Sequence, residues 1–412
     1  MEDVFERFPS LPQQEHLKLL SQKLVSEEAT ELLLCLRNGA NDTISAAYLG
    51  LSLTYADIVV EEIVFARKPV NKQIGDILFN LMNSNGYPGV DDKTSPRVLS
   101  FWMSYVEFVQ NAEGDFPGDT KPGWLKTSYQ RILDIVWLCL TKVCWPADGS
   151  TDDWDTEDLS QFKAFRVDVQ DLVQTVYTIL GIRLMNELAE RAISLQHSSD
   201  WPKLEAILFA LNALADSSAP HEESANDALS ALFSSTLFDE HVFKPKITKL
   251  KKTKLRTVSL YAIFFENHPR YLSPLLNWLF DMLKDPEVGE MAAQSIATIC
   301  SVCRAVLVPE LDTLLQNYLT LLRDESFRGD PEEKLMTATV SIIQALASEE
   351  SKAELLKYLI ETVNVRFNAG VNNALVSTFH DFNALWTAIS VQWRLATAFE
   401  WSVKCLGKSC IS

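Results

Sequence analysis

Apolar residues recur every three or four positions along most of the chain, most clearly from Trp201 to about Phe367. The segment 309–322 fits this spacing best, because one face of a helix would carry most of its apolar side chains. Those side chains belong to Leu311, Leu314, Leu315, Tyr318 and Leu322. A helix with a single apolar stripe cannot bury it alone, so successive helices are expected to stack.

The stacked helices are expected to form repeated pairs. First helices of such pairs are predicted to begin near Trp201, Lys254, Glu287 and Pro331, on the scale of the roughly 40–47 residues of HEAT-type repeats. Proline often stands at the predicted helix starts, where a missing N–H costs nothing: Pro202, Pro269, Pro286, Pro309 and Pro331. The pattern predicts an all-α fold, a right-handed superhelical solenoid of HEAT-type antiparallel helix pairs, similar to armadillo repeats.

The first half of the chain is also read as helical, with three or four short helices in residues 11–66 and Ser26 capping one of them. One of these short helices is predicted at 55–67, and further helices are predicted at 69–82, 97–111, 124–145 and 162–195, of which the last two are long. Gly, Pro and Asp clusters mark loops at 83–96, 113–123 and 146–158. No segment of convincing length alternates as a strand does.

These segments suggest four parts, at 1–95, 96–200, 201–367 and 368–412. In the last part the repeat pattern degrades, and Trp386, Trp393, Phe399 and Trp401 stand where a polar capping repeat is expected. We therefore expect the sequence to be a fragment or an altered gene product.

Composition narrows the class of partner. The net charge of −18 argues against direct nucleic-acid binding, which requires a basic footprint. An acidic surface suits basic partners, although it also simply keeps a large helical protein in solution. Seven cysteines, an odd number, do not suggest a disulfide framework, and neither a signal peptide nor a membrane span is recognised. We expect a soluble protein of a reducing compartment.

No catalytic motif is found: the sequence lacks a Gly-rich phosphate loop, a nucleophile elbow and a His-Glu-x-x-His motif. The protein is therefore expected to be no enzyme and to need no cofactor or metal. Cys300 and Cys303 have the spacing of a redox or zinc motif, but neither a thioredoxin-like context nor a second ligand pair accompanies them. Two thiols on one helix face are better explained by core packing.

Two charged stretches are candidate binding sites. The acidic stretch 146–158 could bind basic cargo, or it could be a solvated loop between helices. Trp154 within it is expected to be exposed and suits an interface hot spot. The candidate residues are Asp152, Asp153, Trp154, Asp155, Glu157 and Asp158.

The second stretch, residues 244–256, carries seven cations in thirteen positions. It could bind an acidic partner or the acidic face of a GTPase, or serve as a nuclear localisation patch, or form a solvated helix face. The candidate residues are Lys246, Lys249, Lys251, Lys252 and Lys254.

Several blocks between about residues 90 and 350 resemble, in the same order, the karyopherin-β (importin-β) superfamily and especially its transportin-SR and importin-thirteen branch. The blocks are 98–107, 162–172, 201–211, 267–277 and 292–304. They are packing motifs, so no binding residue of the family is carried over.

The resemblance implies a nuclear transport receptor that shuttles between nucleus and cytoplasm. Its implied partners are protein cargo, basic or rich in Arg and Ser, the GTPase Ran and phenylalanine-glycine nucleoporins, which the family binds in grooves between outer helices. The chain is less than half the family's usual length, and the N-terminal Ran-binding repeats are not recognised, so Ran binding is expected to be weakened or lost. The alternative is a HEAT-repeat scaffold with no role in transport.

Overall fold

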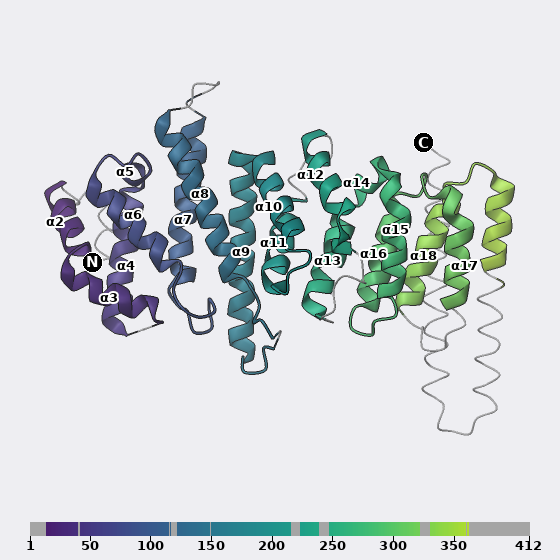
Figure 1. Cartoon of the computed structure of the whole chain (residues 1–412), viewed down its shortest axis with the longest axis horizontal. Coiled ribbons are helices and arrows are strands. Elements are labelled where there is room, and N and C mark those ends of the chain that lie inside the picture. The colour runs from purple at the N-terminus through teal and green to yellow at the C-terminus, as the bar shows by residue number, and fades with distance from the viewer. Residues whose placement is uncertain are drawn as a thin grey trace. The chain divides into compact units, whose positions relative to one another are not determined.

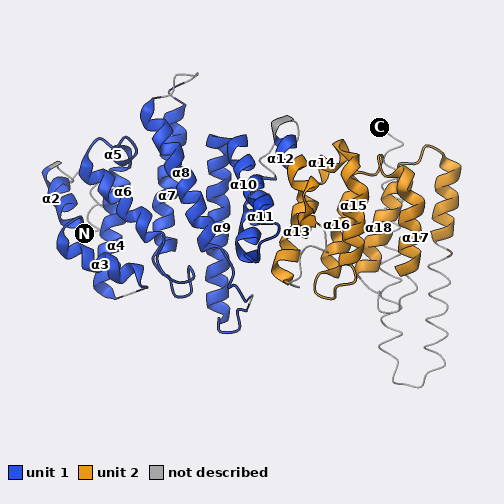
Figure 2. Ribbon diagram, viewed as in Figure 1, with its two compact units in different colours: residues 1–228 blue, residues 229–412 orange. Residues whose placement is uncertain are grey.

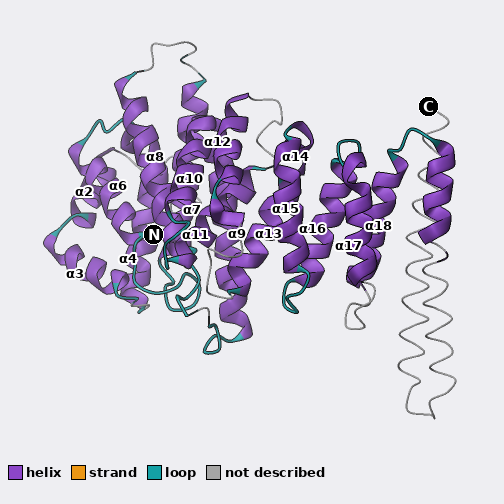
Figure 3. Cartoon of the chain, turned by 45° about the vertical axis from the view of Figure 1, so that its right-hand side comes forward, coloured by secondary structure: helices purple, strands orange, loops and turns teal. Residues whose placement is uncertain are grey.

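The computed structural model describes residues 14–39, 42–114, 116, 122–148, 150–215, 223–238, 247–321, 330–359 and 361. Within these ranges the chain is helical, and the single β pairing is an isolated bridge between Pro88 and Asp92 (Figure 3). The predicted all-α fold is confirmed. No helix in the described part has the length and apolar character needed to cross a membrane.

The chain divides into two compact units, residues 1–228 and 229–412 (Figure 2). The boundary falls inside helix α12 (Glu223–Ser234). The first unit contains ten further helices in its described part (Figure 1). They are α2 (Gln14–Leu24), α3 (Glu27–Arg37), α4 (Thr43–Ile58), α5 (Val60–Val64), α6 (Pro69–Leu81), α7 (Ser95–Glu113), α8 (Gly123–Lys142), α9 (Thr156–Leu180), α10 (Ile182–Ser194) and α11 (Trp201–Leu214).

In the first unit, helix α9 is the central packing element and contacts α7, α8, α10 and α11. Its buried side chains recur at helical spacing, from Phe162 and Phe165 to Val169, Leu172 and Val176. The predicted apolar stripe is thus confirmed. It is buried between neighbouring helices, as expected for helices that cannot bury a stripe alone.

The single long helix predicted over 162–195 is wrong, because the chain breaks at Gly181 into α9 and α10. Gly181 has φ +53° and ψ −137°, a conformation that glycine adopts readily and other residues rarely do. The helix predicted over 55–67 is likewise divided, since α4 ends at Ile58 and α5 begins at Val60.

Two buried ion pairs join segments of the first unit. Arg166 on α9 binds Glu205 on α11 at 2.8 Å, and both side chains are less than 10% exposed. Lys142 at the end of α8 contacts Asp92 at 2.7 Å and donates to the carbonyl oxygens of Ser84 and Gly86. These contacts fix the loop before α7 against α8.

The second unit consists of the end of α12, six named helices, three short 3₁₀ turns and a helical stretch at 349–359 in its described part. The helices are α13 (Thr248–Leu260), α14 (Ala262–Asn267), α15 (Leu272–Met282), α16 (Gly289–Val302), α17 (Leu311–Leu321) and α18 (Asp330–Gln344). The turns are η1 (Thr236–Phe238), η2 (Pro269–Tyr271) and η3 (Val308–Glu310).

Helix α16 packs against both α13 and α18, while α15 packs on α16 and α17 packs on α18. This is a stack of helix pairs, as predicted. The helix starts expected near Trp201, Glu287 and Pro331 lie within two residues of the observed starts of α11, α16 and α18. Helix α13 begins at Thr248, earlier than the expected Lys254. The predicted tail 368–412 lies outside the described residues.

Cys300 and Cys303 are 1% and 0% exposed, respectively, which agrees with the packing interpretation. The Cys303 thiol lies 3.6 Å from the Ala262 carbonyl oxygen. Burial raises the pKa of Cys303 to about 12 and also raises the pKa of Cys300. In the described part, no group of three or more His, Cys, Asp or Glu side chains is arranged to hold a metal ion.

Candidate functional site

The acidic stretch lies partly in a loop and partly at the start of α9. Asp155 is the N-cap of this helix, where its side chain accepts from the Asp158 N–H at 2.8 Å and the Asp158 side chain accepts from the Asp155 N–H at 3.3 Å. Glu157 accepts a hydrogen bond from Gln161. These acids stabilise the positive end of the helix. The prediction that the loop extends to residue 158 is wrong, because α9 already begins at Thr156. Asp152 and Asp153 remain exposed in the loop before them.

Trp154 is half-buried, so its predicted exposure is wrong. Its ring lies 5.2 Å from Tyr87, 5.0 Å from Phe162 and 6.3 Å from Trp145, measured between ring centroids. The loop 83–96 and the start of α9 thus meet in an aromatic cluster. A role for Asp152, Asp153 and Trp154 in cargo binding stays a prediction.

The cationic stretch is divided by the geometry of α13. Lys252 is exposed, whereas Lys251 pairs with Asp285 at 2.6 Å and Lys249 is half-buried. Lys254 is 5% exposed and donates to the carbonyl oxygen of Leu237, so its assignment to a surface patch is wrong. Burial, with a smaller contribution from nearby Lys251, lowers the pKa of Lys254 to about 8. Lys246 lies outside the described residues.

The reason for the burial of Lys254 is helical spacing. Leu250 precedes it by four residues and Val258 follows it by four, and both are buried. Residues four apart share a face of a helix, so Lys254 lies on the core face of α13.

A small apolar groove lies between α3 and α6 in the first unit and has a volume of about 180 Å³. Leu33, Leu34, Ile77 and Leu81 form its apolar lining, and Leu34 is 54% exposed. Thr30, Arg37 and Asn80 complete the lining. The sequence analysis did not single out this groove, because its residues belong to two helices that follow the general apolar pattern.

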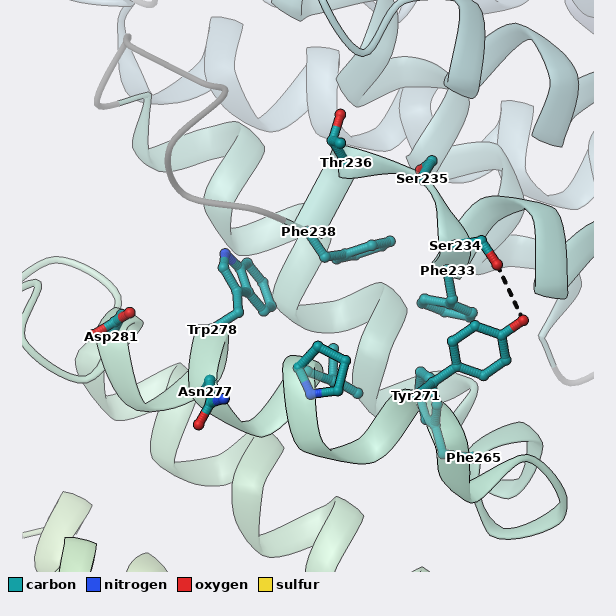
Figure 4. A pocket seen from close by; sticks show the side chains of 12 residues that line it. Phe233, Ser234, Ser235, Thr236, Phe238, Phe265, Tyr271, Asn277, Trp278 and Asp281 are labelled. Atoms are coloured by element: carbon teal, nitrogen blue, oxygen red, sulfur yellow. Dashed lines mark hydrogen bonds between the residues drawn. The ribbon is translucent and has the colours of Figure 1, made fainter.

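A larger cavity of about 500 Å³ lies within the second unit, where α12 and η1 face η2 and α15 (Figure 4). Its aromatic lining comes from five elements, α12, η1, α14, η2 and α15: Phe233, Phe238, Phe265, Tyr271 and Trp278. Trp278 and Phe238 stand nearly at right angles, with ring centroids 5.7 Å apart. We call this the aromatic cavity.

Helix breaks create the aromatic cavity. His268 ends α14 because the residue before a proline is driven out of the helical conformation, and it has φ −130° and ψ 67° before Pro269. On the opposite side the Ser235 hydroxyl donates to the Leu232 carbonyl oxygen at 2.6 Å, where α12 gives way to η1. The short turns η1 and η2 place Phe238 and Tyr271 between the longer helices (Figure 4).

Polar groups also line the aromatic cavity: Ser234, Ser235, Thr236, Asn277 and Asp281. At one end, Tyr271 lies 3.1 Å from the Ser234 hydroxyl, accepts from Arg270 at 2.7 Å and donates to the Ser230 carbonyl oxygen at 3.3 Å. Burial alone would raise the pKa of Tyr271, but hydrogen bonds with Ser234, Ser230 and Arg270 and the arginine charge together lower it.

The sequence analysis missed this cavity, although residues 233–278 contain an available signal. Aromatic residues gather there on both sides of the break at Pro269, instead of following one helix face. Such a gathering at interrupted helices indicates a site where side chains line space between helices.

A sequence comparison relates the second unit to a known family. The model described as the third TPR domain of Transportin-3/Importin-13 matches residues 247–317, which include much of the aromatic cavity. Importin-13 of Rattus norvegicus is 23% identical over 282 residues, covering 67% of this chain and 28% of that protein. Importin beta-like protein kap111 of Schizosaccharomyces pombe is 22% identical over 322 residues, covering 77% of this chain and 32% of that protein.

Solved structures agree with the predicted fold. The structure of Importin13 in its cytosolic state has a TM-score of 0.72 at 17% identity and covers 93% of this chain and 43% of that one. A structure of Kap95p with RanGDP has a TM-score of 0.52 at 13% identity and covers 96% of this chain and 50% of that one. These likenesses establish an all-α solenoid of helix pairs.

The fold therefore defines an all-α helical-repeat protein. The chain is similar in sequence to importin-13 and to the importin beta-like protein kap111, so the predicted resemblance is confirmed. The chain spans about a third or less of the length of the curated relatives described above.

Proposed function

We propose that the chain acts as a nuclear transport receptor of the importin-β type, which binds protein cargo and nucleoporins and shuttles between nucleus and cytoplasm. The observation that carries this proposal is the sequence similarity to Importin-13 over 67% of the chain. The mechanism is binding without catalysis. Transport through the nuclear pore requires many weak contacts, and stacked helix pairs offer repeated grooves for them.

The groove between α3 and α6 is proposed to take up the phenylalanine side chain of a phenylalanine-glycine nucleoporin segment. Leu33, Leu34 and Ile77 supply the apolar contact surface. Full burial of such a side chain contributes about 2–3 kcal/mol. A single contact of this size is weak, which suits a partner that must be released quickly.

Basic cargo is proposed to bind where exposed acids surround the cluster of Trp154. Asp152 and Asp153 provide charge there, and the partly exposed ring of Trp154 offers a surface for packing. The overall charge of −18 favours the approach of such cargo through long-range attraction. Regulation by RanGTP is proposed by analogy with the Kap95p structure, in which the partner is RanGDP.

The first test compares two exposed leucines. Leu34→Glu places a charge in the groove, whereas Leu19→Glu changes a leucine on α2 that is 62% exposed and does not line the groove. We expect Leu34→Glu to weaken binding of a fluorescent phenylalanine-glycine peptide to the full chain by about tenfold or more. Leu19→Glu should bind like the unchanged protein, as measured by fluorescence anisotropy.

Equal binding of the peptide by both variants would show that its phenylalanine binds outside the groove between α3 and α6. A parallel pull-down with Ran loaded with GTP tests the regulatory part. If neither the peptide nor Ran binds the full chain, the transport proposal fails and the HEAT-repeat scaffold becomes the better explanation.

A further inference from the structure

The aromatic cavity differs in chemistry from a groove for an apolar side chain. It is larger than the groove of the first unit, at about 500 Å³ against about 180 Å³, and it combines aromatic walls with polar groups. Asn277 and Asp281 are exposed among the lining residues, so an occupant of the cavity meets polar groups as well as aromatic rings. The occupant should therefore carry both an apolar stem and a polar end.

We propose that the aromatic cavity binds the guanidinium group of an arginine in an extended segment of a partner protein. The further statement that this partner is transported cargo rests on the function proposed above. Arginine has a planar cation that stacks on aromatic rings and carries five N–H donors and no acceptor. Trp278 and Phe238 meet edge to face, with ring centroids 5.7 Å apart, so their contact with each other covers one ring face of the pair. A guanidinium over the Trp278 face gains a cation–π contact.

The cavity also offers hydrogen-bond acceptors. The Ser235 hydroxyl donates its hydrogen to the Leu232 carbonyl oxygen and accepts from the Leu237 N–H at 3.4 Å, which leaves one lone pair of its oxygen. Asn277 adds an amide oxygen and Asp281 adds a carboxylate. Among the described residues that line the cavity, Asp281 is the acidic one, whereas Arg270 binds Tyr271 at the other end. The end formed by Trp278 and Asp281 is therefore the one that suits a cation.

Asp281 pairs at 2.7 Å with Lys284, which lies in the turn after α15. The two side chains are 47% and 69% exposed, and such surface pairs contribute little to stability. An incoming guanidinium can replace Lys284 and make a bidentate pair that a lysine cannot make. The existing ion pair therefore does not block the site.

The first unit shows how a similar set of side chains holds an arginine. The Cζ atom of Arg166 lies 4.2 Å from the ring centre of Phe209 and 5.1 Å from that of Trp145. Its guanidinium makes two hydrogen bonds to Glu205, at 2.8 and 3.1 Å. The aromatic cavity provides the same three kinds of group. The chain's own Arg270 lies over Tyr271 at one end, with its Cζ atom 4.7 Å from the ring centre, and no described arginine lines the end formed by Trp278 and Asp281. We infer that a partner supplies the arginine there.

The test uses the full chain labelled with 5-fluorotryptophan, in which Trp278→Phe assigns the Trp278 fluorine signal. The probes are short Gly/Ser peptides that differ in one residue, which is arginine, citrulline, lysine or phenylalanine. Citrulline is the closest control, because it keeps the planar shape and lacks the charge. We expect the arginine peptide to shift the Trp278 signal and to bind at least about fivefold more tightly than the other three.

Asp281→Asn and Asp312→Asn form a matched pair of variants. Both aspartates are exposed residues of the second unit, but Asp312 lies on α17 and does not line the cavity. We expect Asp281→Asn to weaken arginine-peptide binding by about three- to tenfold and Asp312→Asn to leave it unchanged. Equal effects of the two variants would reduce the interaction to general attraction and overturn the proposal.

A phenylalanine peptide that shifts Trp278 more strongly than the arginine peptide would also overturn it. The probes are free peptides, so their binding does not depend on Ran or on nucleoporins. Loss of Ran and nucleoporin binding with an intact arginine response would defeat the transport function alone. Intact binding of Ran and nucleoporins without a response to the arginine peptide would overturn the arginine site alone.

Discussion

Arg166 in the first unit and the aromatic cavity in the second unit use the same types of side chain in opposite ways. Around Arg166, two aromatic rings and Glu205 enclose a cation that belongs to the chain itself. In the aromatic cavity, Trp278, Phe238 and Asp281 surround open volume instead. Two aromatic rings and a carboxylate can therefore serve two purposes. They stabilise helix packing when the arginine belongs to the chain, and they can bind a partner when the partner supplies the arginine.

The position of each set within its unit explains its role. Arg166 lies on the 25-residue helix α9 and reaches the neighbouring α11 across a packed interface. The aromatic cavity is built around helix breaks, by the end of α12, by η1 and η2, and by α15. Continuous helices pack side chains closely, whereas interruptions leave room between them. Charged groups at such interruptions also keep access to water.

The largest expected effect is a loss of folding stability when Arg166 of the first unit is replaced. Arg166→Leu leaves the buried carboxylate of Glu205, 2% exposed, without its cation. We expect the free energy of unfolding to fall by about 3–5 kcal/mol, as measured by urea denaturation. Adding Glu205→Leu should restore a large part of this loss, because the double variant no longer buries an unpaired charge. A loss below about 1 kcal/mol in the single variant would show that the pair is not structural.

An intermediate effect is expected from Lys254, the buried cation that contacts the carbonyl of Leu237 beside the aromatic cavity. Its pKa is lowered from 10.5 to about 8 in the folded protein. Between these two values the unfolded chain binds more protons than the folded one, so stability rises with pH. Below the lower value, the cost of burying the charged amine is constant.

Urea denaturation at pH values on either side of this window measures the effect. The gain on raising the pH should be at most about 3 kcal/mol, and Lys254→Met should abolish it. A gain of the same size in Lys254→Met would assign the titration to another group. Because Lys254 anchors Leu237, next to Phe238, this variant also tests whether the cavity wall depends on that contact.

The smallest expected effect on folding stability is that of replacing Asp281 in the aromatic cavity, and it is to be compared with the effect at Glu205. Asp281→Asn should change the free energy of unfolding by less than about 0.5 kcal/mol, because Asp281 forms only a surface pair in the free protein. The same variant should weaken binding of the arginine peptide. A carboxylate that matters for binding but not for folding is the opposite of Glu205. A large loss of stability in Asp281→Asn would remove the distinction between the two regions.

The sequence predicted the helices well where an apolar stripe runs without interruption. The starts of α11, α16 and α18 and the burial of Cys300 and Cys303 follow from helical spacing alone. The division at Gly181 was missed because glycine is tolerated inside helices as well as between them. Its positive φ is decided by how α10 must turn to pack against α9.

The candidate sites were predicted less well than the fold. A run of lysines suggests a surface, yet the position of Lys254 between Leu250 and Val258 assigns it to the core face. Helical spacing should have outweighed charge at that position. Trp154 could not be placed from sequence, because its partners Tyr87 and Trp145 belong to other segments. Contacts of that kind depend on tertiary packing.

Because the cysteines differ in burial, one of them can be labelled selectively to monitor the binding of partners. Of the five cysteines in the described part, Cys35 is the exposed one, next to Leu34 of the first-unit groove. Burial raises the pKa of Cys139, Cys144 and Cys303 to about 12, so few of their thiols are ionised at neutral pH. With serine at Cys405 and Cys410, a maleimide dye at Cys35 would turn occupancy of the groove into an optical signal.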